Sequence, residues 1–340
     1  MTPPAGTALA ERTRVRLAYQ PLAPRRQADH ASTPHPHRPI DADLLRIPVG
    51  PGAIHVERYG HGGAPVILIH GFGTCSFLWR HVAPSLAVTH HTAYAVDLLG
   101  YGESDRPFDA DFGLAAQADY LERAMTALRV ARAAVVGVDI GAAIALRLAA
   151  VRPERVARLV LVNPVPLEEI PAEDIRTLQR NTARFALRVS RGLFGASPLL
   201  TPVLLGSVAE PDRMPAVLVG RYLAPYVGHE GVTHLLALAR SVRALDFEDL
   251  DLSHVRAHTL VVRGDKDQWV EPGHTETLQR SIPECRLVTM ENVARLIPEE
   301  APAELAELIV DFVSPHVGKG LDETDPLGEN VDAGDPEMAP

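Results

Sequence analysis

The chain has 340 residues, of which 46% are hydrophobic and 22% are charged, a balance typical of a globular protein with one or two domains. The formal net charge of −10 argues against a nucleic-acid-binding protein, because nucleic acid is bound by a basic face. The two cysteines, Cys75 and Cys285, exclude a disulfide scaffold, and no CxxC pair starts a zinc site.

The sequence also sets expectations about location. No apolar run reaches the ~20 residues of a membrane helix, and residues 1–40 hold no apolar block of signal-peptide length. The Arg25-Arg26 pair is followed by a polar stretch, unlike a twin-arginine signal. We therefore expect a cytoplasmic protein with no membrane partner and with reduced thiols.

Taken in chain order, residues 1–40 carry a net charge of +4 and seven prolines, and residues 317–340 carry −6. Both stretches are too polar to bury a core, which predicts disordered tails. Between the tails, short apolar runs alternate with helical patterns. Strands are expected at 45–49, 53–59, 66–69, 93–98, 133–138, 159–162, 260–263 and 286–290, and helices at 113–129, 140–152 and 302–313. This alternation predicts an α/β fold with a mostly parallel, doubly wound sheet.

One interval breaks the alternation. Residues 164–244 show no strand, and their pattern is helical with frequent prolines. Because open α/β sheets bind ligands at their carboxyl edge, we expect this helical insertion to form a cap there. The core would then comprise residues 41–163 and 245–316.

The sharpest motif lies in residues 135–144, VVGVDIGAAI. A buried strand runs into Gly137-Val138-Asp139-Ile140-Gly141 and then into an Ala-rich helix, as in a nucleophile elbow of the form G-x-Nu-x-G. The tight turn requires tiny residues two positions before and after the nucleophile. It would aim the Asp139 carboxylate into the crevice; the alternative is a helix N-cap aspartate.

A second loop, His70-Gly71-Phe72-Gly73, follows the strand VILI. The backbone N–H groups of Phe72 and Ile140 are candidate donors of an oxyanion hole. His70 could reach the pocket, but we interpret it as a structural histidine of the loop.

The order HGFG, DLLGYGESDRP, GVDIGA, helical insertion and VVRGDKD resembles the α/β-hydrolase superfamily over about residues 45–315. HGFGTCSFLWR and the elbow aspartate are most similar to the haloalkane dehalogenase and epoxide hydrolase branch. The resemblance implies an α/β-hydrolase fold in which Asp139 attacks an electrophilic carbon and forms an ester. No ligand cluster or GxGxxG motif indicates a metal or organic cofactor.

The resemblance also places the remaining catalytic positions. The family's spacing after the strand places the acid at Asp267, with Asp265 as the fallback, whereas Asn163 fills an alternative acid position without a carboxylate. The ending Glu300-Ala301-Pro302 sets the register of the last motif, and the family's catalytic histidine falls on Arg295. Phe72 and Ile140 also replace the Asn and Trp with which many dehalogenases bind halide, and Gly73 replaces a common Pro.

Arg295 is expected to join Asp139 and Asp267 in an ion triad, because a planar guanidinium suits two carboxylates; otherwise it would turn to solvent. Arginine cannot activate water at neutral pH, since it has no acceptor. A histidine elsewhere could substitute, with His274, His229 and His234 as candidates.

Three aromatic residues could line the pocket. Trp269 lies two residues past Asp267, and Tyr222 and Tyr226 lie in the insertion, where epoxide hydrolases carry tyrosines that polarise the epoxide. Core or surface positions are the alternative for both tyrosines.

Three functions remain open. The first is an enzyme acting on a small apolar molecule through Asp139, with impaired or non-hydrolytic turnover. The second is a catalytically inactive binding or scaffold protein, and the third is an ordinary hydrolase with a relocated histidine. The sequence leaves the substrate and the oligomeric state open.

Overall fold

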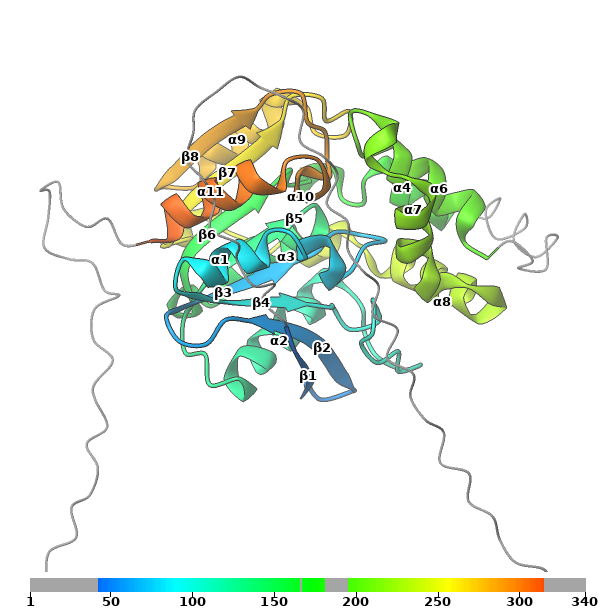
Figure 1. Ribbon diagram of the computed structural model, residues 1–340, viewed down its shortest axis with the longest axis horizontal. Coiled ribbons are helices and arrows are strands. Elements are labelled where there is room, and N and C mark those ends of the chain that lie inside the picture. Colours follow the sequence, from blue (N-terminus) through cyan, green and yellow to red (C-terminus); the bar gives the residue numbers. More distant parts are fainter. Residues whose placement is uncertain (1–41, 166, 181–194, 315–340) are drawn as a thin grey trace, which may run out of the picture. The chain divides into compact units, whose positions relative to one another are not determined.

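The computed structural model describes residues 42–165, 167–180 and 195–314, so the two predicted tails lie outside the described residues. Eight strands form one sheet in the order β1-β2-β4-β3-β5-β6-β7-β8 (Figure 1). β1 and β2 pair antiparallel, as do β2 and β4, and the remaining neighbours are parallel. The strands are β1 Asp43–Pro48, β2 Ala53–Tyr59, β3 Ala64–Ile69, β4 His91–Val96, β5 Ala133–Val138, β6 Val156–Val162, β7 His258–Gly264 and β8 Cys285–Met290. The predicted mostly parallel sheet is confirmed.

Helices cover both faces of the sheet because the central strands are apolar on both faces. Alternate residues of β6 enter opposite cores: Leu159 and Leu161 pack with α2 and α3, and Val160 and Val162 pack with α1 and α11. The helices of the core are α1 Ala83–Val88, α2 Leu114–Ala127, α3 Ile140–Val151, α9 Pro272–Ser281, α10 Ile297–Glu300 and α11 Pro302–Val313. None of the helices in the described ranges is long and apolar enough to cross a membrane.

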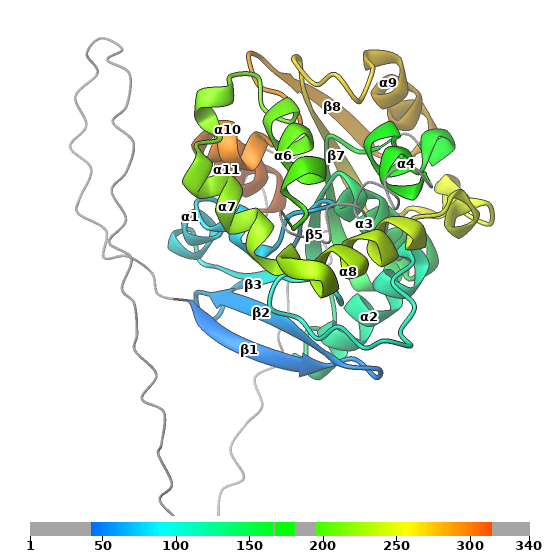
Figure 2. The ribbon, with the colours of Figure 1, turned by 90° about the vertical axis from the view of Figure 1, so that its right-hand side faces the viewer.

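The segment between β6 and β7, residues 163–257, is here called the insertion, and it extends past residue 244, where the sequence pattern placed its end. The regular elements described in it are all helical. Its α-helices are α4 Glu173–Gln179, α6 Ser197–Gly206, α7 Ala216–Leu223 and α8 Gly228–Ser241. Pro202 lies within α6 and does not end this helix. α6, α7 and α8 gather beside the ends of the central strands in both views (Figure 2).

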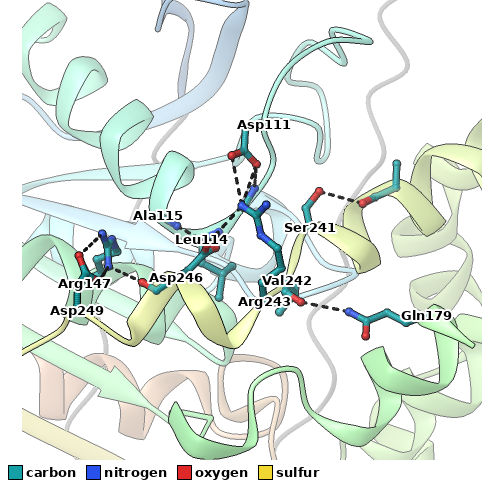
Figure 3. A network of polar contacts seen from close by, with 12 residues as sticks. Asp111, Leu114, Ala115, Arg147, Gln179, Ser241, Val242, Arg243, Asp246 and Asp249 are labelled. Atoms are coloured by element: carbon teal, nitrogen blue, oxygen red, sulfur yellow. Dashed lines mark hydrogen bonds and ion pairs between the residues drawn. The ribbon is translucent and has the colours of Figure 1, made fainter.

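Polar contacts attach the end of the insertion to the core (Figure 3). Asp246 Oδ2 accepts a hydrogen bond of 2.7 Å from the Leu114 backbone N–H and so occupies the N-terminus of α2. Arg147 of α3 donates to the Asp246 carbonyl oxygen and, at 2.9 Å, to Asp249. The chain that returns from α8 therefore lies in a defined position on α2 and α3.

Candidate active site at the carboxyl edge of the sheet

Asp139 lies at a sharp turn between β5 and α3. Its backbone has φ of 56° and ψ of −121°, a left-handed conformation that costs energy in a residue with a Cβ. A Cβ at Gly137 would lie 2.1 Å from the Gly141 carbonyl oxygen, and one at Gly141 would lie 2.4 Å from the His70 carbonyl oxygen. The turn therefore requires both glycines, as the elbow motif predicts.

The loop after β3 contacts the elbow through a backbone donor. The Phe72 N–H donates to Asp139 Oδ2 at 2.9 Å, so this predicted oxyanion donor is bonded to the aspartate itself. The His70 ring is fully buried, and its Nε2 accepts from the Leu98 N–H at 3.1 Å. The proton must then lie on Nδ1, which donates to the Gly71 carbonyl oxygen at 2.8 Å. Burial lowers the pKa of His70, which favours this neutral, structural state.

Asn163 holds the loop that carries Arg295. Its Nδ2 donates to the carbonyl oxygens of Ala294 and Arg295 at 2.9 and 3.0 Å, and its Oδ1 accepts from the Gly264 N–H at 2.8 Å. Asn163 is fully buried and has φ of 41°. Glu300 supports the same loop by accepting from the Ala294 N–H at 2.7 Å. These contacts fix where the Arg295 side chain begins.

Arg295 is buried and forms ion pairs with two carboxylates. One guanidinium nitrogen, Nη2, donates to Asp139 Oδ1, and the other, Nη1, donates to Asp174 Oδ2 at 3.0 Å. The three side chains are each 3–4% exposed. The neighbouring carboxylates raise the pKa of Arg295 further, although burial alone would lower it. The guanidinium is therefore a permanent cation that points into the site rather than toward solvent.

The expected ion triad of Asp139, Arg295 and Asp267 was wrong about Asp267. Arg295 pairs with Asp174 of α4, whereas Asp267 accepts from the backbone N–H groups of Trp269 and Val270, at 2.8 and 3.3 Å, through Oδ1. Asp267 Oδ2 is buried and has no hydrogen-bond partner among the described residues. Burial raises the pKa of Asp267, because an ionised carboxylate with a free oxygen is poorly solvated there.

Trp269 lies next to this site, as its sequence position suggests. Its ring faces the Arg295 guanidinium, with 5.5 Å from Cζ to the ring centroid. Trp269 also lines a cavity of about 590 Å³, together with Ala172 and Glu173 of the insertion and Glu271 and His274 of the core. The cavity lies between the insertion and the loop after β7.

The two candidate tyrosines differ in their surroundings. The Tyr222 hydroxyl donates to Glu299, which also pairs with Arg80 at 2.6 Å. Tyr222 therefore has a structural partner, and its place in the pocket stays a prediction. The Tyr226 hydroxyl is buried and has no partner within the described ranges. Burial raises the pKa of Tyr226, which keeps its proton on the oxygen. Tyr226 thus retains a hydroxyl that can donate to a ligand.

The histidines proposed as replacements have other partners. His274 Nε2 lies 3.3 Å from Glu169 Oε1, and His234 Nε2 donates to the Gly100 carbonyl oxygen at 2.6 Å. His229 is exposed at the start of α8. Within the described ranges, none of these three histidines bonds to Asp139 or Asp267. No group of three His, Cys, Asp or Glu in these ranges is arranged to hold a metal ion.

Asp174 is the site residue that the sequence interpretation missed. It lies four positions before Leu178 in α4, so both share one helix face, and both are buried. A charged residue on the apolar face of an insertion helix was the available signal. Its partner could not be read from the sequence, because Asp174 and Arg295 are 121 positions apart.

Comparison with known proteins supports the fold and widens the range of relatives. The alpha/beta hydrolase fold family matches residues 64–302. Lipase 3 of Moraxella sp. is 29% identical over 283 residues, which cover 78% of this chain and 82% of the lipase. A haloalkane dehalogenase of Agrobacterium fabrum is 33% identical over 147 residues, which cover 43% of this chain and 47% of the dehalogenase.

A solved structure agrees with these sequence matches at the level of fold. The unliganded epoxide hydrolase CorEH superposes with a TM-score of 0.69, covers 80% of this chain and 98% of its own, and is 18% identical. The eight-stranded sheet, the elbow and the family match lead to one conclusion. The chain belongs to the alpha/beta hydrolase fold family, and its relatives support a hydrolase.

Proposed function

We propose that Asp139 is a nucleophile that forms an ester with a small apolar electrophile, and that Arg295 prevents ordinary hydrolysis of this ester. The observation that carries the proposal is the buried Arg295 guanidinium bonded to the Asp139 carboxylate. The similarity to a haloalkane dehalogenase supports the choice of electrophile.

The first step needs no base, because an ionised carboxylate already has the attacking electron pair. With a haloalkane, a bond forms between an Asp139 oxygen and the carbon, the carbon–halogen bond breaks, and halide leaves. With an epoxide, a ring C–O bond breaks and the released oxygen takes a proton. The buried Tyr226 hydroxyl, which has no partner in the described part of the chain, is our candidate donor.

The second step fails for a physical reason. Water that attacks the ester must lose a proton, and general-base assistance contributes ~10²–10⁴-fold. Arg295 has no acceptor atom, and its pKa is raised above the ordinary value. His70 has both nitrogens bonded to the backbone. We therefore expect the ester to persist.

The hydrogen bonds of Asp139 favour a second function, reversible ligand binding. Both Asp139 oxygens are already bonded, Oδ2 to the Phe72 N–H and Oδ1 to Arg295. Such a carboxylate is a weaker nucleophile, so a ligand-binding protein that performs no chemistry is the alternative. Its expected behaviour is reversible binding without covalent change.

Intact mass spectrometry of the full chain, after incubation with bromoalkanes or with epoxides, separates these functions. We expect one persistent adduct per molecule, located on Asp139 by peptide mapping and absent from Asp139→Asn. Asp265→Asn is the matched control, since Asp265 is a nearby, more exposed carboxylate, and this variant should keep the adduct. Binding without an adduct would support the binding protein.

The variant Arg295→His tests the second step. A histidine at this position could place an imidazole beside Asp139, and the free oxygen of Asp267 could accept its N–H. We expect the adduct to disappear and product to accumulate over many turnovers. Continued persistence of the adduct in this variant would show that Arg295 alone does not block hydrolysis.

A further inference from the structure

The insertion contributes a carboxylate to the site through α4. Asp174 is buried, with 3% of its side chain exposed, and it takes one guanidinium nitrogen of Arg295 while Asp139 takes the other. The single cation therefore bridges an acid of the insertion and an acid of the core. Its charge is shared between them.

The position of α4 is fixed by contacts with α8. Gln179 Nε2, at the end of α4, donates to the carbonyl oxygens of Ala239 and Val242 at 2.8 and 3.2 Å. Val242 is followed by the segment that Asp246 and Arg147 attach to α2 and α3 (Figure 3). Asp174 thus lies on a helix that is held at its end by α8 and at Asp174 by Arg295.

We propose that Asp174 is a positioning residue that sets the reactivity of Asp139 through Arg295. Its negative charge offsets part of the guanidinium charge that would otherwise fall on Asp139, and its hydrogen bond directs Nη1 away from Asp139. Without Asp174, Arg295 keeps its ion pair with Asp139 and loses the other one. The Asp139 carboxylate is then more strongly neutralised and attacks carbon more slowly.

The positioning role of Asp174 rests on the proposed alkylation of Asp139. It is measured by the rate at which the adduct forms. We expect Asp174→Asn to slow alkylation about tenfold. The maximal rate should fall, and the electrophile concentration that gives the half-maximal rate should change less. Glu230→Gln is the matched control, because Glu230 is an exposed carboxylate of the insertion, in the first turn of α8. This control should alkylate at the unaltered rate, and an equal slowing in it would overturn the proposal.

A double variant separates positioning from general damage. In an Arg295→Met background, Asp174→Asn should no longer slow alkylation, because the cation through which Asp174 acts is gone. If Asp174→Asn slows alkylation equally in both backgrounds, Asp174 acts through folding alone and the proposal is wrong.

Hydrogen exchange of α4 makes the test independent of alkylation. Asp174→Asn should raise amide exchange across Glu173–Gln179, whereas Glu230→Gln, on a different helix, should leave it unchanged. If no adduct forms in any variant but exchange rises as expected, the proposed alkylation fails and the ionic contact stands. Unchanged exchange in Asp174→Asn would overturn the positioning role whatever the adducts show.

Discussion

The elbow and the loop after β7 both place an aspartate at the carboxyl edge of the sheet, yet the two carboxylates have opposite surroundings. Both oxygens of Asp139 are bonded, to a backbone N–H and to a buried guanidinium. Asp267 has one bonded oxygen and one buried oxygen without a partner in the described ranges. Arg295 thus pairs with an acid of the insertion and leaves the nearby core acid unsatisfied.

The difference shows how a buried guanidinium selects its acceptors. A planar guanidinium needs acceptors at defined directions, and here Asp139 and Asp174 supply them. The acid loop keeps its backbone hydrogen bonds and needs no cation to fold. Three substitutions test this contrast.

The largest effect is expected from Arg295→Met. It leaves two buried carboxylates without their cation, and removing one partner of a buried ion pair typically costs about 3–5 kcal/mol. Urea denaturation should show this loss in the free energy of unfolding. Arg240→Met is the control, because Arg240 is exposed on α8, and it should change stability by less than about 0.5 kcal/mol. Equal effects in both variants would contradict the buried contact.

An intermediate effect is expected from Asn163→Asp. The carboxylate cannot donate to the carbonyl oxygens of Ala294 and Arg295, so two buried acceptors lose their partner, at about 2–3 kcal/mol in total. Chemical denaturation measures the loss. Asn292→Asp, an exposed position in the same loop region, serves as control and should have little effect. A stable Asn163→Asp variant would show that another contact holds the Arg295 loop.

The smallest effect is expected from Asp267→Asn, and it depends on pH. The pKa of Asp267 is raised in the folded state, so the folded chain binds this proton more tightly than the unfolded chain. Stability from this group is therefore present at low pH and lost as pH rises through the folded pKa. Relative to the wild type, Asp267→Asn should therefore gain stability as the pH rises from 4 to 7. A loss over that range would mean that Asp267 is stabilised as an anion.

The sequence predicted the parts of the site that depend on local geometry. The steric need for Gly137 and Gly141 follows from the elbow spacing, and the carboxyl edge follows from the order of parallel strands. Arg295 was placed by the register of its motif. These features require only neighbouring residues and a regular sheet.

The acid partner of Arg295 required tertiary information. Asp267 was the expected partner because it follows a core strand, but α4 brings Asp174 to the guanidinium. The packing of insertion helices depends on side chains from distant segments, such as Gln179 on the end of α8. The hydrogen-bond partner of Tyr222 also required tertiary information, since Glu299 belongs to α10.

The most direct test of the central claim counts the product released per protein molecule when the wild-type chain is mixed with excess bromoalkane. Because the residue opposite Asp139 is a permanent cation, we predict that bromide release stops after about one equivalent, with the ester retained on the protein. Continued release over many equivalents, with free alcohol accumulating, would contradict the account.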